Sequence, residues 1–197
     1  MARVVPLIDF STIDMNGHAL TMEDVRALNP QRYEMEHLSG IIHVDKVNHI
    51  IVGYKDVRDD EFWVRGHMPG YPLLPGVIIC EACAQLSAFY GKLYVGNPDA
   101  VIGLGGLEDV RFRAAVRPGD RLILVCKGTR VDRRQLACET QAWVGDKLAF
   151  HGRIIGYPIP GGEEIWKVVR PAQAALDLKD RLAALAAQHS ADASEPK

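Results

Sequence analysis

The segment from residue 66 to residue 85 reads GHMPGYPLLPGVIICEACAQ, and its two halves have opposite characters. Glycine and proline punctuate the first half, which predicts a loop over Gly66 to Gly76. Apolar residues fill the second half and continue beyond it, which predicts a helix from about Gly76 to Tyr94, buried on nearly every face. The segment therefore predicts a stiff loop that leads into one central helix.

Short strands are predicted on both sides of this helix. Ahead of it, Ile41 to Val57 indicates one long strand or a hairpin, and Glu61 to Arg65 a second short strand. After the helix, Gly103, Gly105 and Gly106 are expected to break the chain. Four further strands are predicted at Val110–Val116, Arg121–Val131, Leu136–Val144 and Lys147–Tyr157. The simplest architecture is α+β, with one antiparallel sheet wrapped around one long apolar helix.

The length of 197 residues suits a single domain with extensions. We divide the chain into an N-terminal extension (1–30), a central domain (31–160) and a C-terminal segment (161–197). A short helix is expected at Thr21 to Leu28, capped by Thr21 with Asp24 three residues later. A C-terminal helix is expected to start near Pro171, before a disordered tail from Ser190. Its amphipathic stripe consists of Ala175, Leu178, Leu182 and Leu185.

Composition argues against several classes of protein. The net charge of −2 gives no electrostatic support for nucleic-acid binding. Leu73 to Tyr90, the most apolar stretch, contains Pro, Gly and Glu, so we expect a buried helix there and no membrane span. Met1 to Phe10 has no cleavage-like site, so a cytoplasmic location is expected.

The cysteines and histidines do not form a metal-binding pattern. Cys80 and Cys83 lie inside the predicted helix, and no second pair accompanies them, so zinc is not expected. We interpret these two, together with Cys126 and Cys138, as small apolar core residues, which suits a reducing compartment. No organic cofactor is expected either.

Two side chains in the opening segment suit proton transfer. Glu81 is the only charged residue between His67 and Lys92, and an unpaired carboxylate in apolar surroundings is costly. A carboxyl kept protonated there could act as a general acid, unless it reaches solvent or pairs with an arginine. His67 lies on the stiff loop, where it could exchange a proton near neutral pH or could have no special role.

Two more residues could assist this chemistry. Gly76 opens the helix, where free backbone N–H groups could polarise a carbonyl oxygen, although a simple loop-to-helix turn is an equal alternative. Gln85 lies one turn beyond Glu81, so it could orient the carboxyl, orient a leaving hydroxyl, or make a structural hydrogen bond. Together these parts suit the elimination of water beta to a thioester.

At this segment the sequence resembles the 3-hydroxyacyl-acyl-carrier-protein dehydratases of the FabZ type. Their pattern is Gly-His-Phe-Pro-Gly, then Pro-Gly-Val, then Glu-Ala-x-Ala-Gln, and only Met68 departs from it, standing where Phe is usual. The resemblance covers roughly residues 30 to 157 and continues in Val44-Asp45-Lys46-Val47, in Val110-Arg111-Phe112-Arg113 and in the turn Pro118-Gly119-Asp120.

The resemblance implies the hot-dog fold and a homodimer whose two sheets join; a trimer of dimers stays open. It implies that His67 of one subunit is the base, that Glu81 of the other is the acid, and that the Gly76 N–H binds the thioester carbonyl. It further implies an acyl site walled by Met68, Pro69 and Val77, and acyl carrier protein as the partner that delivers the substrate. Glu at position 81, where the related dehydratase-isomerases have Asp, favours the FabZ type.

The sequence departs from the family around its first strand. The family has a compact Pro-His-Arg-x-Pro-Phe stretch there, whereas here Pro30-Gln31-Arg32-Tyr33 precedes a longer run, and both termini are extended. Two alternatives therefore stay open: a hot-dog thioesterase, against which His67 argues, and a non-catalytic subunit that binds acyl chains or a partner enzyme. The acyl-chain length, the choice between carrier protein and coenzyme A, and the pathway are not given by the sequence.

Overall fold

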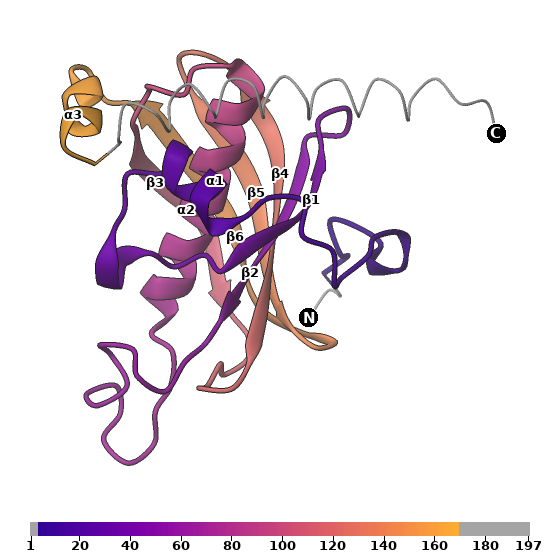
Figure 1. Ribbon diagram of the computed structural model, residues 1–197. Coiled ribbons are helices and arrows are strands. Elements are labelled where there is room, and N and C mark those ends of the chain that lie inside the picture. Colours follow the sequence, from indigo (N-terminus) through magenta and orange to yellow (C-terminus); the bar gives the residue numbers. More distant parts are fainter. Residues whose placement is uncertain (1–3, 170–197) are drawn as a thin grey trace.

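The computed structural model describes residues 4–169, in which six strands form one antiparallel sheet (Figure 1). Their order across the sheet is β1-β2-β4-β5-β6-β3, so β1 and β3 are the edge strands. The strands are β1 (Gly40–Asp45), β2 (Ile50–Asp56), β3 (Ile102–Phe112), β4 (Arg121–Val131), β5 (Leu136–Val144) and β6 (Lys147–Pro158).

The central helix α2 (Gly76–Val95) lies along one face of this sheet, and the short helix α1 (Met22–Leu28) packs beside it (Figure 1). Most of α2 is buried, including the large rings of Phe89 and Tyr90. Burial of so much apolar surface, at about 25 cal/mol per Å² removed from water, is the main contribution to stability here. A less buried stripe of α2 contains Val77, Glu81, Ala84 and Ala88.

The opposite face of the sheet carries a second apolar cluster. The N-terminal segment before α1 runs across that face, as Figure 1 shows in indigo. Its 3-10 turn η1 (Phe10–Thr12) places the Phe10 ring edge-on against Trp143, with ring centroids 5.8 Å apart and planes at 78°. The sheet is therefore covered by apolar side chains on both faces. The cluster contains Ile42, Ile50, Val52, Tyr54, Ile123, Val125 and Trp143.

Most of the predicted elements are confirmed. The α+β architecture is as expected, β4 and β5 begin and end at the predicted residues, and Ile41–Val57 is a hairpin. Thr21 and Asp24 form the predicted reciprocal capping box of α1. All four cysteines are free and buried. Their environments make them core residues, and burial raises the pKa of the Cys138 thiol to about 12.

Two of the strand predictions are wrong. Glu61 to Arg65 forms turns, because the Glu61 side chain turns inward to a buried lysine instead of alternating with its neighbours across a strand. The glycines at 103 to 106 do not break the chain, since β3 runs through them and ends at Phe112, not at Val116. A Cβ on Gly105 would lie 2.3 Å from the Tyr157 ring, so this glycine lets a side chain of β6 pack on the strand.

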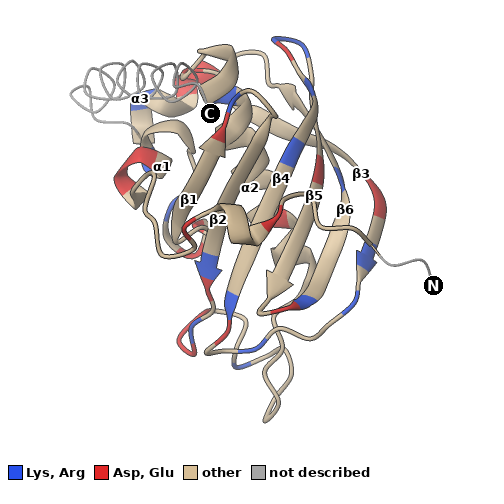
Figure 2. Ribbon diagram, turned by 90° about the vertical axis from the view of Figure 1, so that its right-hand side faces the viewer, with Lys and Arg blue, Asp and Glu red and all other residues tan. Residues whose placement is uncertain are grey.

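The remaining turns lie around the sheet: η2 (Tyr33–Met35), η3 (Gly162–Ile165) and α3 (Trp166–Val169). The helix predicted near Pro171, its stripe and the tail from Ser190 lie outside the described residues. Among residues 4–169, no helix is long and apolar enough to cross a membrane. In Figure 2 acidic and basic residues are interspersed over the strands and loops, as the near-neutral net charge suggests.

The contact between the N-terminal segment and the sheet can be measured with a double-mutant cycle. We expect Phe10→Leu to lower the free energy of unfolding by about 1 kcal/mol, near the value of one edge-to-face aromatic pair. Denaturant unfolding of Phe10→Leu, Trp143→Leu and the double variant should give a coupling energy of that size. A coupling energy of zero would show that the segment does not stabilise the sheet through this contact.

Candidate active site

His67 lies within the long segment that joins β2 to α2 and is held there by backbone hydrogen bonds. Its backbone N–H donates to the Trp63 carbonyl over 2.8 Å, and the Leu73 N–H donates to the His67 carbonyl over 2.8 Å. The ring atom Nδ1 lies 2.8 Å from the Leu73 carbonyl oxygen. A carbonyl only accepts, so Nδ1 carries the proton, and in the neutral ring Nε2 has a free lone pair.

The start of α2 follows the loop directly. Pro75 is the N-cap, and the first N–H groups after it have no carbonyl within the helix to bond. A Cβ on Gly76 would lie 2.6 Å from the Phe112 ring, so only glycine lets that ring pack against the helix start. The loop is tied to the body of the protein where the Leu74 N–H donates to the Val116 carbonyl over 2.8 Å.

Glu81 is held by Gln85, one helical turn further on. Nε2 of Gln85 donates to Oε1 of Glu81 over 2.8 Å and also to the Met35 carbonyl over 2.7 Å. Its oxygen accepts the His37 backbone N–H over 3.0 Å, so all polar atoms of this amide, which is 3% exposed, are bonded. Glu81 itself is partly exposed. The carboxyl is therefore fixed from the core side and open on the other.

Within residues 4–169, His67 and Glu81 form no hydrogen bond or ion pair with each other. The loop that carries His67 extends beyond the end of the sheet, away from the middle of α2 (Figure 1). Its tip has no charged residue, as the tan ribbon at the bottom of Figure 2 shows. Within the described residues, each of the two side chains is thus bonded to a different partner: His67 to Leu73 and Glu81 to Gln85.

A hollow of about 80 Å³ lies beside Glu81, between the stripe of α2 and the strands β3 and β6. Gln31 lines it too, and its Oε1 is buried with no hydrogen-bond partner among the described residues. The sequence showed Gln31 only as a departure from the family pattern and gave no sign that it lines the same hollow as Glu81. The other lining residues are Ala84, Gln85, Ala88, Ile102, Gly103, Leu104, Leu136, Ile154, Ile155 and Gly156.

The residues expected to wall the acyl site lie elsewhere in the single chain. Met68 is 49% exposed, Val77 is 70% exposed and Pro69 is exposed as well. In the described part of the chain none of the three lines the hollow beside Glu81. Other large apolar side chains exposed in the described part of the chain include Tyr71, Leu104, Leu107 and Phe112.

A buried ion pair anchors the loop ahead of His67, and the sequence did not reveal it. Nζ of Lys55 on β2 lies 2.8 Å from Oε2 of Glu61, with both side chains less than a tenth exposed. Glu61 also accepts hydrogen bonds from the Arg58 backbone N–H and the Trp63 ring. Nearby His37 is buried, and this desolvation, with the Lys55 charge, lowers its pKa to about 4.

One antiparallel sheet curved around a single long helix is the hot-dog fold, which defines the class of this protein. The FabA-like domain model matches residues 29–153, and the chain belongs to that family. The chain is 31% identical over 136 residues to the 3-hydroxyacyl-acyl-carrier-protein dehydratase FabZ of Clostridioides difficile, covering 69% of this chain and 95% of the relative. It is 33% identical over 139 residues to FabZ of Acinetobacter baylyi, covering 69% and 93%.

Solved structures support the fold. The dehydratase heterocomplex ApeI:P from Xenorhabdus doucetiae matches with a TM-score of 0.60 at 19% identity, over 73% of this chain and 96% of that one. Cj0977, a virulence protein from Campylobacter jejuni, matches with a TM-score of 0.52 at 14% identity, over 75% and 96%. Both comparisons bear on the fold alone.

The buried ion pair makes a prediction about stability. Glu61→Gln would leave the Lys55 ammonium buried without its counter-charge, so we expect the free energy of unfolding to fall by roughly 3–5 kcal/mol. Asp60→Asn is the matched control, because the neighbouring pair of Asp60 with Arg58 is about 70% exposed and should contribute little. Denaturant unfolding at neutral pH compares the two. Equal losses in both variants would contradict the anchoring role of Glu61.

The loss of stability in Glu61→Gln should depend on pH. Burial alone would raise the pKa of Glu61, but hydrogen bonds from Lys55, the Arg58 N–H and Trp63 together hold it below its usual value. A carboxyl whose pKa is lowered by folding stabilises the fold fully at pH values above its unfolded pKa of about 4.3. This stabilisation is lost as the pH falls through the pKa that the carboxyl has in the folded state. The difference between wild type and Glu61→Gln should therefore be complete at neutral pH and shrink below about pH 4.

Proposed function

We propose that this hydro-lyase dehydrates (3R)-3-hydroxyacyl chains carried by acyl carrier protein to the trans-2-enoyl products, in fatty acid or related lipid biosynthesis. His67 is the general base and Glu81 the general acid. The bond from Nδ1 of His67 to the Leu73 carbonyl is the observation that carries the proposal, since it leaves Nε2 as a proton acceptor.

The elimination needs three groups. Nε2 of His67 takes a proton from C2 of the acyl chain, and the N–H of Gly76 stabilises the negative charge that develops on the thioester oxygen. The positive end of the α2 dipole adds to this stabilisation. Glu81, in its acid form, gives a proton to the hydroxyl on C3 while the C3–O bond breaks. Water leaves, and the electrons of the broken C2–H bond form the new double bond.

Within residues 4–169 the side chains of His67 and Glu81 do not bond to each other, and this supports a site made by two copies. In the described part of the chain β3 pairs with β6 only, so its outer edge is free to pair with β3 of a second copy. The same edge and the start of α2 carry exposed apolar side chains, which a homodimer would cover. The residues concerned are Val77, Leu104, Leu107 and Phe112.

Acyl carrier protein is proposed as the substrate carrier because the curated relatives are named for it. The FabZ-type reaction is favoured over thioester hydrolysis because hydrolysis does not require a histidine held in this way. The two reactions also have different products: dehydration changes the acyl chain and keeps the thioester, whereas hydrolysis releases a thiol.

Hydration of crotonyl thioesters, the reverse reaction, tests the proposed pair. We expect His67→Ala and Glu81→Gln each to lower the rate by about 10²–10⁴-fold, the usual contribution of a general acid or base. His18→Ala and Glu139→Gln replace exposed residues of the same types. They are the matched controls and should keep full activity. Loss of enoyl absorbance gives the rate on carrier protein and on coenzyme A. Release of thiol in place of hydration would favour the thioesterase, and acyl binding without turnover the non-catalytic subunit.

A mixing experiment tests the shared site. In a dimer of one His67→Ala and one Glu81→Gln subunit, one site lacks both groups and the other site keeps both. Two inactive variants, exchanged to a statistical mixture, should therefore recover about a quarter of the wild-type rate if the site spans a two-fold dimer. The size and mass of the mixed protein show whether subunits have exchanged. A mixture that has exchanged subunits but stays inactive would place both groups in one chain.

A further inference from the structure

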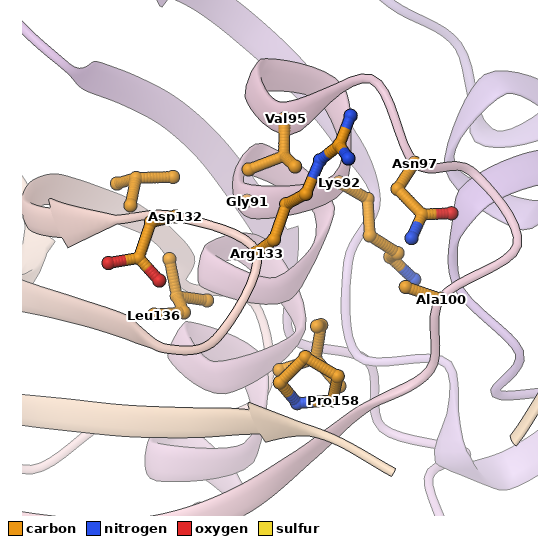
Figure 3. A pocket seen from close by; sticks show the side chains of 11 residues that line it. Gly91, Lys92, Val95, Asn97, Ala100, Asp132, Arg133, Leu136 and Pro158 are labelled. Atoms are coloured by element: carbon orange, nitrogen blue, oxygen red, sulfur yellow. The ribbon is translucent and has the colours of Figure 1, made fainter. Parts of the chain in front are cut away.

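Two hollows lie in line along α2, and they share two lining residues. The first is the hollow beside Glu81, and the second, of about 60 Å³, lies at the C-terminal end of the helix (Figure 3). Ile102 of β3 and Leu136 of β5 line both of them. These two side chains therefore form the partition between the hollows.

The two side chains of the partition pack closely against glycines. A Cβ on Gly91 of α2 would lie 3.1 Å from Cδ1 of Leu136, so the leucine packs directly on the helix backbone. A Cβ on Gly156 would lie 2.7 Å from Cγ2 of Ile102. Leu136 is 4% exposed and pairs with Gly156 in the ladder between β5 and β6. Both partition side chains thus pack closely against backbone, which does not move aside as the end of a flexible side chain can.

The α2 side chains that line the two hollows would otherwise form a continuous path. Ala84, Ala88 and Gly91 follow one another on the same face at helical spacing and carry at most a methyl group. They extend over about 10 Å of the helix, from the hollow beside Glu81 to the second hollow. The partition crosses this path near its far end.

The second hollow suits the end of an alkyl chain. Figure 3 shows the apolar side chains of Val95, Ala100, Leu136 and Pro158 around it. The exposed polar side chains of Asn97, Asp132 and Arg133 line it as well. Lys92 also lines it, but its Nζ donates to the Leu28 carbonyl and lies 5.4 Å from the centre of the Trp166 ring. The Lys92 charge is thus engaged by other groups, and the apolar part of the lining could hold the end of an alkyl chain.

We propose that Leu136 and Ile102 limit the length of the acyl chain, so that the enzyme prefers short-chain thioesters. The first hollow takes a short alkyl segment beyond the reacting carbons, and the partition excludes longer ones. This inference rests on the proposed function, because it assumes that the acyl chain enters beside Glu81. Removing the Leu136 side chain beyond Cβ joins the two hollows and admits longer chains.

Turnover of crotonyl, octenoyl and dodecenoyl thioesters on carrier protein measures this limit. We expect kcat/KM of the wild type to fall by about tenfold or more from crotonyl to dodecenoyl, and Leu136→Ala to reverse most of that fall. Leu124→Ala, which truncates a fully buried leucine of β4 outside both hollows, is the matched control for lost stability. Leu136→Val and Ile102→Val provide milder openings if the alanine variant does not fold.

The outcomes separate the two proposals. A wild type that hydrates dodecenoyl as fast as crotonyl, or a Leu136→Ala profile identical to that of Leu124→Ala, would overturn the chain-length limit. No turnover of any thioester would refute the dehydratase function. In that case, calorimetric binding of butanoyl- and dodecanoyl-pantetheine still tests the limit: the wild type should bind the short chain only and Leu136→Ala both, and any other pattern would overturn it.

Discussion

The apolar surface of α2 must be covered on almost every side, and this requirement organises the rest of the protein. The sheet covers one side of the helix and α1 another. The one stripe left open begins with Val77 at the start of the helix and includes Glu81. A carboxyl on a fully buried face would have been costly, whereas here Gln85 binds it from the core and the hollow lies in front of it.

Local patterns predicted the parts of the fold that local physics determines. Proline and glycine fix the loop from 66 to 76, and the turns at both ends of β5 determine its bounds. The prediction failed where the burial and packing of particular side chains decide the local structure. Glu61 turns inward to the buried Lys55 near the end of β2, and Gly105 lies in a strand where Tyr157 of β6 packs across it. Neither partner is visible from the residues that flank these positions.

The candidate site, too, could be predicted from the sequence only in part. His67 and Glu81 could be proposed from one motif, since loop and helix are adjacent in the chain. Their different hydrogen-bond partners within a single chain could not, because these depend on how the loop folds back on itself and on how α2 packs. Gln31 and Leu136 also escaped notice. One is a polar residue before a strand and the other an ordinary strand leucine, and only the packing of distant elements brings both to the hollow beside Glu81.

The proposed acid and base are held by different means, and the difference explains the buried ion pair. Glu81 lies on a helix inside the core, whereas His67 lies on a loop that the sheet does not support. A buried ion pair is often no more stable than an apolar pair of the same volume, so stability alone does not account for Lys55 and Glu61. The Glu61 carboxylate accepts hydrogen bonds from Lys55, from the ring of Trp63 and from a backbone N–H. Three donors fix the orientation of this side chain, which apolar contacts could not do. Because the Trp63 carbonyl in turn accepts the His67 N–H, the ion pair orients the loop that carries the proposed base.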